Sequence, residues 1–537
     1  MVYLRTASMA KNGQGALVIK ICFSVDDLEV LYKVKTIPGR QYYSDLRCWS
    51  APLYEDNINL LRKWGFSIAS NLDKFIEKRK ERTSLSKNNI PGLKGVLYPF
   101  QDRGVSFIEA HNGRALIADE MGLGKTVQAL AWLQLHPEKR PVIVITPASL
   151  KLNWERESKS WMGNPRIEIL SGTTTWKTKG DLLIINYDIL PDWVDELKRR
   201  HPQVLITDEC HYYKSNSAKR TKAVKRLAKN IPHILALSGT PIVNRPIEIY
   251  NAVKIISPDL FPDYWEFIHY YCNAKRTNFG LDISGASHTK ELNERLTSSI
   301  MIRRLKQDVL PDLPAKVRSF VPIQLHNIKE YRAAEGDFIT FIKEQKGAEA
   351  AIRASKAKAF AEIEGLKQLS VKGKLEEAID WIDNFLTVDG KLVVFAVHKF
   401  VIDAIMDRFK DIAVKIDGSV SNVARQKAVD SFQNDKNIRL FVGNIQAAGV
   451  GITLTASTNV AFLELPWTPG QVSQAEDRCH RIGQKDAVNI YYLLAKGTIE
   501  ERIARLLDRK REVLDAVLDG IDSDEDSLLI SIMNEYL

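Results

Sequence analysis

The stretch Asp119-Glu-Met-Gly-Leu-Gly-Lys-Thr126 contains two glycines and ends in a lysine and a threonine. It follows an apolar run, Ala115-Leu-Ile-Ala118, and it opens a second apolar run with helical character. Gly122 and Gly124 allow backbone N–H groups to close around phosphate oxygens, and the amino terminus of the following helix adds positive potential. The stretch therefore predicts a strand, a phosphate-binding loop and a helix in succession.

Two side chains at the end of this loop have the chemistry that a nucleotide requires. Lys125 is placed to reach the β- and γ-phosphates of ATP, and the Thr126 hydroxyl is placed to ligate Mg²⁺. One residue departs from the usual pattern of such loops, because Asp119 stands where the first glycine is expected.

Short apolar runs alternate with helix-like stretches on both sides of the loop, which predicts parallel strands in sheets that carry helices on both faces. Five runs belong to a first set and five to a second. We therefore predict an α/β fold with two tandem lobes. The runs are 115–118, 142–145, 182–185, 204–206 and 234–237, then 392–395, 413–416, 439–442, 460–463 and 489–494.

These patterns predict a domain plan with helical insertions and a small amino-terminal α+β segment. Polar residues Glu77–Lys87 are expected to link that segment to the first lobe. The predicted parts are the amino-terminal segment 1–80, a first lobe 90–310, a helical linker or insertion 311–371, a second lobe 372–507 and a helical tail 508–537.

The composition is that of a soluble intracellular protein. Of 537 residues, 76 are Lys or Arg and 66 are Asp or Glu, and the net charge of +10 raises the expectation of a polyanionic partner. The five cysteines form no Cys-x-x-Cys pair, which argues against zinc sites and a disulfide scaffold. No run of about 18 apolar residues indicates a membrane span. We expect a cytoplasmic protein if the source is bacterial or viral, and a nuclear one if it is eukaryotic.

A second motif strengthens the nucleotide interpretation. Val204-Leu-Ile-Thr-Asp-Glu-Cys-His211 places two carboxylates directly after an apolar strand. Asp208 is suited to hold Mg²⁺ through water, and Glu209 to orient and deprotonate an attacking water. Upstream of the loop, Gln101 carries an amide that can donate and accept at the edge of adenine.

Several longer blocks resemble the Swi/Snf family of ATPases in helicase superfamily two. The resemblance extends from Leu97 to about Leu514, and it is strongest at Gln474-Ala-Glu-Asp-Arg-Cys-His-Arg-Ile-Gly-Gln484. Three further blocks carry it: Ile145-Thr-Pro-Ala-Ser-Leu-Lys-Leu-Asn-Trp154, Ser238-Gly-Thr-Pro241 and Arg303-Arg-Leu-Lys-Gln-Asp-Val-Leu-Pro-Asp-Leu-Pro314. It implies two RecA-like lobes and a monomeric enzyme that uses ATP and Mg²⁺ to translocate on double-stranded or branched DNA.

The resemblance also implies roles for residues of the second lobe. Arg478 and Arg481 lie three apart, so one helix would present both on one face. In the family these positions are arginine fingers, although either could instead pair with Glu476 or Asp477. Gly451 lies in a stretch similar to the family's coupling motif, in which Ala448 replaces a usual glycine.

The residues that the resemblance assigns to DNA come from both lobes. In the first lobe they are Thr146, Ser149 and Asn186, whose hydroxyl and amide groups would meet phosphates of a tracked strand. In the second lobe, Trp467 of Leu465-Pro-Trp-Thr-Pro469 is either a contact to the DNA backbone or a buried core tryptophan.

The amino-terminal segment offers a finer resemblance. Residues Ile37 to Leu53 look like part of the HepA-related module that adjoins the motor in annealing helicases, with Arg40 and Arg47 as candidate phosphate contacts. A small docking domain without DNA contact is the alternative.

Three functions are compatible with these motifs. The favoured one is an ATP-dependent double-stranded DNA translocase that remodels DNA by fork regression, strand annealing or protein displacement. The alternatives are an RNA or DNA strand-separating helicase, and a DNA-binding scaffold with weak ATPase activity.

Overall fold

The structure of the protein is a computed structural model, and it describes most of the chain. The predicted linker Glu77–Lys87 and all but one residue of the predicted tail 508–537 lie outside the described residues. Those residues are 5–11, 17–24, 26–37, 40–43, 46–53, 55–74, 90–239, 241–242, 245–277, 280–283, 285–310, 312–344, 349–388, 390–449 and 451–508.

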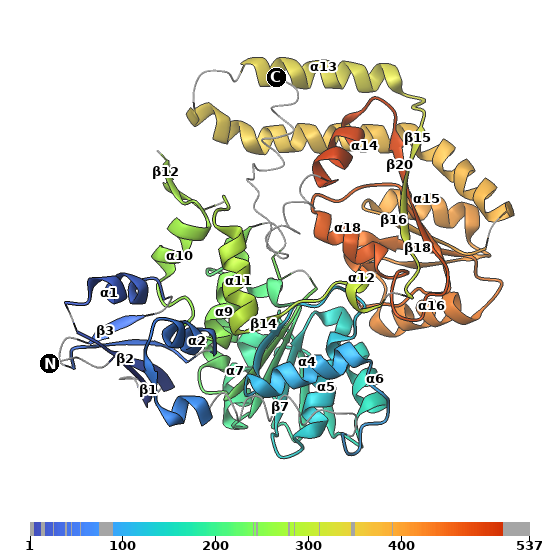
Figure 1. The fold of residues 1–537 in the computed structure, drawn as a ribbon. Coiled ribbons are helices and arrows are strands. Elements are labelled where there is room, and N and C mark those ends of the chain that lie inside the picture. The colour runs from blue at the N-terminus through green and yellow to red at the C-terminus, as the bar shows by residue number, and fades with distance from the viewer. Residues whose placement is uncertain are drawn as a thin grey trace. The chain divides into compact units, whose positions relative to one another are not determined.

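The chain divides into two compact units (Figure 1), and each is described by itself. The first comprises residues 1–120 and 124–304, and the second comprises 121–123 and 305–537. Among the described helices, none is long and apolar enough to cross a membrane.

The first unit is built on a seven-stranded sheet in which every pair of neighbouring strands is parallel. All five residues of each of β7, β9 and β10 are buried, as expected for apolar strands covered on both faces. In spatial order the strands are β14 (Met301–Ile302), β6 (Arg114–Ile117), β11 (His233–Leu237), β10 (Val204–Asp208), β7 (Val142–Thr146), β9 (Leu182–Asn186) and β8 (Ile167–Ile169).

Helices connect these parallel strands, because a parallel pair needs a crossover. The helices that flank the sheet in chain order are α4 (Pro99–Ala110), α5 (Lys125–Leu135), α6 (Lys151–Trp161), α7 (Leu190–Arg199), α8 (Lys219–Ala228) and α9 (Tyr250–Ile256). A further group lies between α9 and β14: α10 (Tyr264–Tyr271), the hairpin β12 (Lys275–Thr277) and β13 (Gly280–Asp282), and α11 (Thr289–Ser299).

The amino-terminal segment has a sheet and a core of its own. Ile19, Ile21 and Val34 are completely buried in that core, together with Ile58 and Leu61. The sheet is antiparallel except for the pair β1 and β5. Its strands in spatial order are β3 (Gln41–Tyr43), β4 (Cys48–Pro52), β2 (Leu17–Cys22), β1 (Thr6–Lys11) and β5 (Ser67–Ile68), and its helices are α1 (Leu28–Lys35) and α2 (Glu55–Lys63).

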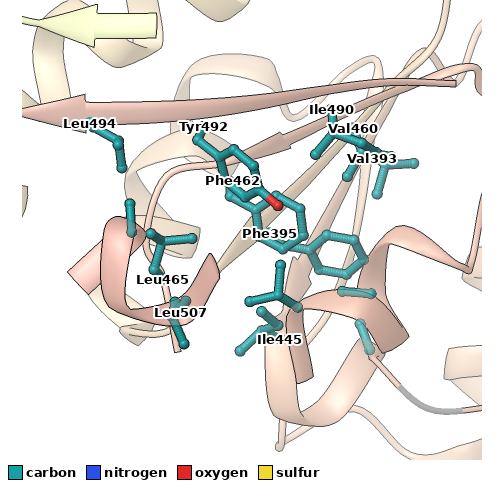
Figure 2. Packing of buried hydrophobic residues seen from close by; sticks show 14 of the residues in the cluster. Val393, Phe395, Ile445, Val460, Phe462, Leu465, Ile490, Tyr492, Leu494 and Leu507 are labelled. Carbon is teal, nitrogen blue, oxygen red and sulfur yellow. The ribbon is translucent and has the colours of Figure 1, made fainter. Parts of the chain in front are cut away.

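The second unit contains a six-stranded sheet that is again parallel throughout. On one face the ring of Phe462 stacks between Phe395 at 5.5 Å and Tyr492 at 5.3 Å, so that three adjacent strands share one aromatic core (Figure 2). In spatial order the strands are β15 (Lys316–Ile323), β20 (Val488–Ala495), β19 (Asn459–Phe462), β16 (Leu392–Ala396), β18 (Leu440–Asn444) and β17 (Ala413–Ile416).

Two long helices, α13 (Ile328–Glu344) and α14 (Glu349–Val388), lie in the chain between β15 and β16. Ile363 and Leu366 of α14 enter the aromatic core, and Ile382 enters the core on the other face. The remaining helices are α12 (Lys306–Val309), α15 (Lys399–Phe409), α16 (Asn422–Asn434), α17 (Ile445–Ala448) and α18 (Pro469–Glu476). The predicted fold class, two α/β lobes with a small amino-terminal α+β segment, is confirmed.

Candidate active site

The motifs of the first lobe meet at one edge of its sheet. The glycine-rich loop follows β6, the two carboxylates lie at the carboxyl end of β10, and Ser238 follows β11. Since these strands are parallel and neighbouring, their carboxyl ends lie at the same edge, which is where open α/β sheets bind ligands.

The loop after β6 has a backbone that requires glycine. Gly122 and Gly124 have φ of +86° and +76°, values that side chains other than glycine rarely adopt. A Cβ atom on Gly124 would also lie 2.4 Å from Nε2 of Gln101. The α5 helix begins immediately afterwards at Lys125, so the loop has the backbone and the helix amino terminus of a phosphate cradle.

Lys125 turns back over this loop. Its Nζ atom donates to the backbone oxygen of Asp119 at 2.8 Å and to that of Glu120 at 3.4 Å. The ammonium group is therefore already at the loop, where it can exchange carbonyl oxygens for phosphate oxygens. Gln101 is 3% exposed, and its Oε1 accepts from the backbone N–H of Tyr98 at 3.0 Å. The amide nitrogen of Gln101 lies close to Gly124, where a Cβ atom would meet it.

The carboxylates after β10 are held by neutral donors. Oδ2 of Asp208 accepts from Nε1 of Trp154 at 2.7 Å and from Oγ1 of Thr146 at 3.1 Å. Burial, together with the neighbouring Glu209 carboxylate, raises the pKa of Asp208 to about 6. A buried carboxylate in this setting is charged most readily when a cation binds nearby, and carboxylate oxygens are what Mg²⁺ prefers.

Glu209 adopts a left-handed backbone with φ of +52°. Its Oε2 accepts from the Ser238 hydroxyl at 3.2 Å and lies 3.4 Å from Nδ1 of His211. Burial and the charge of Lys214 lower the pKa of His211 to about 4, so this imidazole is neutral at physiological pH. Ser238 therefore connects Glu209 to the motif that follows β11, of which Thr240 lies outside the described residues.

The first-lobe residues expected to meet DNA differ in their surroundings. Thr146 is completely buried, and its hydroxyl is bound to Asp208, so a phosphate contact would require that bond to be exchanged. Asn186 is 6% exposed and accepts from Nζ of Lys151 at 3.2 Å. Ser149 is partly exposed in the short turn Ala148–Leu150.

Arg478 and Arg481 converge, although one helix does not present them. α18 ends at Glu476, and both arginines lie in the turns that follow it. The Nη1 atoms of Arg478 and Arg481 donate to the backbone oxygen of Ile452 at 3.3 and 3.2 Å. The two guanidinium groups therefore meet at the predicted coupling motif.

Neighbouring residues complete this arrangement. Gly451 has φ of +78°, which supplies the left-handed turn before Ile452. Ala448 is buried at the end of α17, and Gly449 after it has φ of −66°. The position usually held by glycine is therefore helical here, where alanine fits without strain.

Trp467 is half-buried against α14. Its Nε1 donates to Glu364, and Nζ of Lys367 lies 4.4 Å from the centre of its ring. Glu364 and Lys367 are three residues apart on that helix and 3.5 Å from each other. The indole is thus neither a fully buried core residue nor a freely exposed one.

No local sequence pattern indicates a role for Trp154, Arg304 or Lys306, although these residues contact the motifs. Trp154 and Arg304 bind carboxylates that adjoin the phosphate loop or follow β10. The signal available was their presence in the blocks that carry the family resemblance; their partners are distant in sequence, and only the fold brings them together.

A phosphate loop after one strand, a pair of carboxylates at the end of another strand of the same sheet, and two arginines in a second lobe with a parallel sheet define the class of helicase-like P-loop proteins. The chain matches the SNF2-related domain over residues 67–371 and the helicase conserved C-terminal domain over residues 373–483. It belongs to the SNF2-related family.

Among curated relatives, the chain is 35% identical over 450 residues to the DNA annealing helicase and endonuclease ZRANB3 of Homo sapiens, covering 80% of this chain and 41% of that protein. It is 36% identical over 432 residues to the SWI/SNF-related matrix-associated actin-dependent regulator of chromatin subfamily A-like protein 1 of Xenopus tropicalis, covering 78% and 44%. The chain thus spans less than half the length of these two relatives.

The homolog of the latter protein in Caenorhabditis elegans is 32% identical over 531 residues, which cover 93% of this chain and 74% of that protein. Among solved structures, the Sulfolobus solfataricus SWI2/SNF2 ATPase core in complex with dsDNA is 26% identical, with a TM-score of 0.40 and coverage of 81% of this chain and 95% of that one.

Proposed function

We propose that this chain is an ATP-dependent translocase on double-stranded DNA that remodels DNA structures, by fork regression, strand annealing or protein displacement. The observation that carries the proposal is the meeting of the phosphate loop, Asp208 and Glu209 at one sheet edge. Membership of the SNF2-related family, relatives named as DNA annealing helicases, and a net charge of +10 support DNA as the polymer.

In this proposal the first lobe binds ATP. The backbone at Gly122 and Gly124 cradles the phosphates, Lys125 pairs with them, and Gln101 contacts the adenine edge. Thr126 and Asp208 would hold Mg²⁺, which would neutralise charge on the phosphates. Glu209 orients the attacking water and accepts its proton, and the Ser238 hydrogen bond fixes its carboxylate.

The second lobe contributes Arg478 and Arg481 as arginine fingers, with Gly451 setting the turn that they contact. Such arginines act on charge that develops as the phosphoryl group is transferred. We therefore expect Arg481→Ala to lower kcat by at least ~10³ and to leave ATP affinity nearly unchanged.

DNA contact is assigned to Thr146, Ser149, Asn186 and Trp467, which would touch the backbone rather than the bases. The amino-terminal segment, residues 1–80, is proposed to recognise branched DNA through Arg40 and Arg47. Residues 90–310 and 372–507 form the motor, and the protein acts as a monomer.

The decisive experiment measures steady-state ATPase activity with duplex DNA, forked DNA, single-stranded DNA, RNA or no polymer. We expect the largest stimulation with duplex or forked DNA, no strand separation in a displacement assay, and no activity in Lys125→Ala. Stimulation by RNA above that by duplex DNA would favour the RNA helicase alternative. DNA binding without hydrolysis by the wild-type protein would favour the scaffold.

A further inference from the structure

The chain passes from the first sheet to the second unit through a short segment rich in cations. Only Arg303, Arg304 and Leu305 separate β14, the last strand of the first sheet, from α12 in the second unit. The boundary between the units falls between Arg304 and Leu305. This segment joins the two units covalently, so the contacts at each of its ends bear on the motor.

On the first side, Arg304 is bound to the residues that flank the phosphate loop. Its Nε donates to Oδ1 of Asp119 at 2.9 Å, and its Nη2 donates to Oε1 of Gln128 at 2.9 Å. Asp119 is completely buried at the entrance of the loop, and it also accepts from Nε2 of Gln128 at 2.9 Å. Arg304 therefore joins the start of the loop to the helix that follows it.

This contact explains the departure of the loop from the usual pattern. A glycine in place of Asp119 would leave the Arg304 guanidinium, whose side chain is 11% exposed, without its carboxylate. A buried cation without its partner is costly, so the two residues are needed together. Asp119 thus serves the connection between the lobes in addition to the loop.

On the second side, Lys306 is bound to the turn that carries the two arginines. Its Nζ donates to the backbone oxygen of His480 at 2.6 Å and lies 2.9 Å from Oδ1 of Asp477. Lys306 is 3% exposed and Asp477 is 4% exposed. Lys306 therefore contacts Asp477 and His480, the residues that directly precede Arg478 and Arg481 in the sequence.

Two cations of β15 reinforce the same turn. Lys316 lies 2.8 Å from Asp477 and 2.9 Å from Glu476, and Arg318 donates to Glu476 through two nitrogen atoms at 3.0 and 2.8 Å. Glu476 and Asp477 are thus paired with the segment that enters the second lobe. In the sequence these acids were the alternative partners for Arg478 and Arg481, and the structure gives them other cations.

We propose that Arg304 and Lys306 are positioning residues of the motor: Arg304 holds the phosphate loop in its binding conformation, and Lys306 holds the turn that aims Arg478 and Arg481. This inference rests on the proposed function. Arg304 and Lys306, the two anchors, are two residues apart and lie on opposite sides of the boundary. A rotation of the backbone at Leu305 therefore moves the phosphate loop together with Arg304 and the arginine turn together with Lys306. ATP binding and DNA stepping are thereby coupled through one short segment.

The two anchors predict opposite kinetic defects, which general destabilisation would not produce. Arg304→Gln should raise the KM and the Kd for ATP by about tenfold, because it loosens the loop. Lys306→Met should lower kcat by about tenfold or more and change KM by no more than about twofold, because Arg478 and Arg481 are no longer correctly oriented in the transition state. Lys306→Arg, which keeps the charge, should recover most of the lost kcat.

The experiment measures duplex-stimulated ATPase activity, nucleotide affinity by fluorescence of an N-methylanthraniloyl ATP analogue, and melting temperature on the full chain. Matched controls remove exposed ion pairs, with Arg226→Gln in the first unit and Arg408→Gln in the second. If Arg304→Gln does not fold, Asp119→Asn tests the same contact with a smaller change.

Normal kinetics in Arg304 and Lys306 variants, or equal changes of KM and kcat in both, would overturn this inference. Absence of DNA-stimulated ATPase in the wild-type protein would instead overturn the proposed function.

Discussion

Some residues of the site can be identified from the sequence around them. Others can be identified only from the buried polar contacts that the fold creates. The positions of Lys125, Asp208 and Glu209 after apolar runs predict their roles, and the structure places all three at the same edge of the first sheet. The anchors were not predicted, because Arg304 and its partner Asp119 are 185 residues apart in the sequence. The departure of Asp119 from the usual loop pattern is matched by Arg304, which only the fold brings beside it.

The local structure of one pair of residues differs from the prediction that their spacing gives. Spacing alone placed Arg478 and Arg481 on one face of a helix, but the helix ends at Glu476. The two arginines still meet, because Lys306 and Lys316 hold the acids next to them in a turn. Such a turn is defined by side chains from elsewhere in the chain, which periodicity does not reveal.

The role of Glu209 is tested by Glu209→Gln. The amide keeps the size of the side chain and can still accept from Ser238, but it cannot take a proton from water. We expect turnover to fall by roughly 10² to 10⁴ while ATP still binds, since general bases contribute effects of that size. Asp195→Asn, which changes an exposed acid of the same lobe, is the matched control. Turnover at the wild-type rate in Glu209→Gln would remove this residue from the chemistry.

At the scale of elements, apolar strands were predicted and polar ones were missed. The central strands of both sheets are continuous apolar runs, but β15 has mostly exposed residues and includes Lys316, Arg318 and Pro322. It lies at the edge of its sheet, where one side needs no backbone partner and proline is tolerated. β8 is short and half-exposed at the other sheet's edge, so it also has no apolar signature.

The contact between Glu464, which follows β19, and the residues directly before α15 predicts a pH dependence of stability. Nδ1 of His398 hydrogen-bonds Glu464, and the Glu464 carboxylate also accepts from the backbone N–H groups of Val397 and His398 at 2.8 Å. The Glu464 hydrogen bond raises the pKa of His398 above its ordinary value. A raised histidine pKa stabilises the fold below the unfolded value, about 6.5, and this contribution is lost as the pH rises through the folded value.

We therefore expect the melting temperature of the wild-type protein to exceed that of His398→Gln most at about pH 5.5, and the difference to shrink above the raised pKa. His269→Gln, at an exposed position, should show no such trend. A difference that grows with pH would mean that His398 is neutral in the folded protein.

The contact between Trp467 and α14 decides whether this tryptophan reaches DNA. If it does, Glu364 competes with phosphate for the indole N–H and repels the backbone. Glu364→Ala should then tighten duplex DNA binding about threefold, since one like charge near the polymer is removed. Glu362→Ala removes the same charge two residues earlier and serves as control in an anisotropy titration. A lower melting temperature with unchanged DNA affinity would identify Trp467 as a packing residue.

At the scale of the whole molecule, a motor that grips phosphates should be sensitive to salt and indifferent to sequence. Each phosphate neutralised by Lys or Arg releases counterions, so six to ten contacts would cost about 10³ to 10⁵ in affinity between 50 and 200 mM salt. We expect binding isotherms on unrelated duplexes to coincide at each salt concentration. A strong preference for one duplex sequence would point to base recognition.

The amino-terminal segment can be removed without opening a core, because its sheet and its buried residues are its own. A chain that begins after Lys87 should keep duplex-stimulated ATPase activity and lose regression of a model fork. A fork assay with labelled strands measures the second property. Full regression by the shortened chain would leave the motor standing and would remove the assigned role of residues 1–80.

The strand order of the second lobe has a consequence for biosynthesis. β15 is the first strand of its sheet in the sequence, and its neighbour β20 is the last, with Lys316 opposite Val488. A ribosome therefore releases β15, with Val317 and Phe320, well before the strand that it pairs with exists. Closing such a long loop is slow and exposes apolar surface meanwhile, so the nascent lobe is a natural client for chaperones. Synonymous codons that slow translation between residues 324 and 487 should lower the soluble yield more than the same codons placed after residue 495.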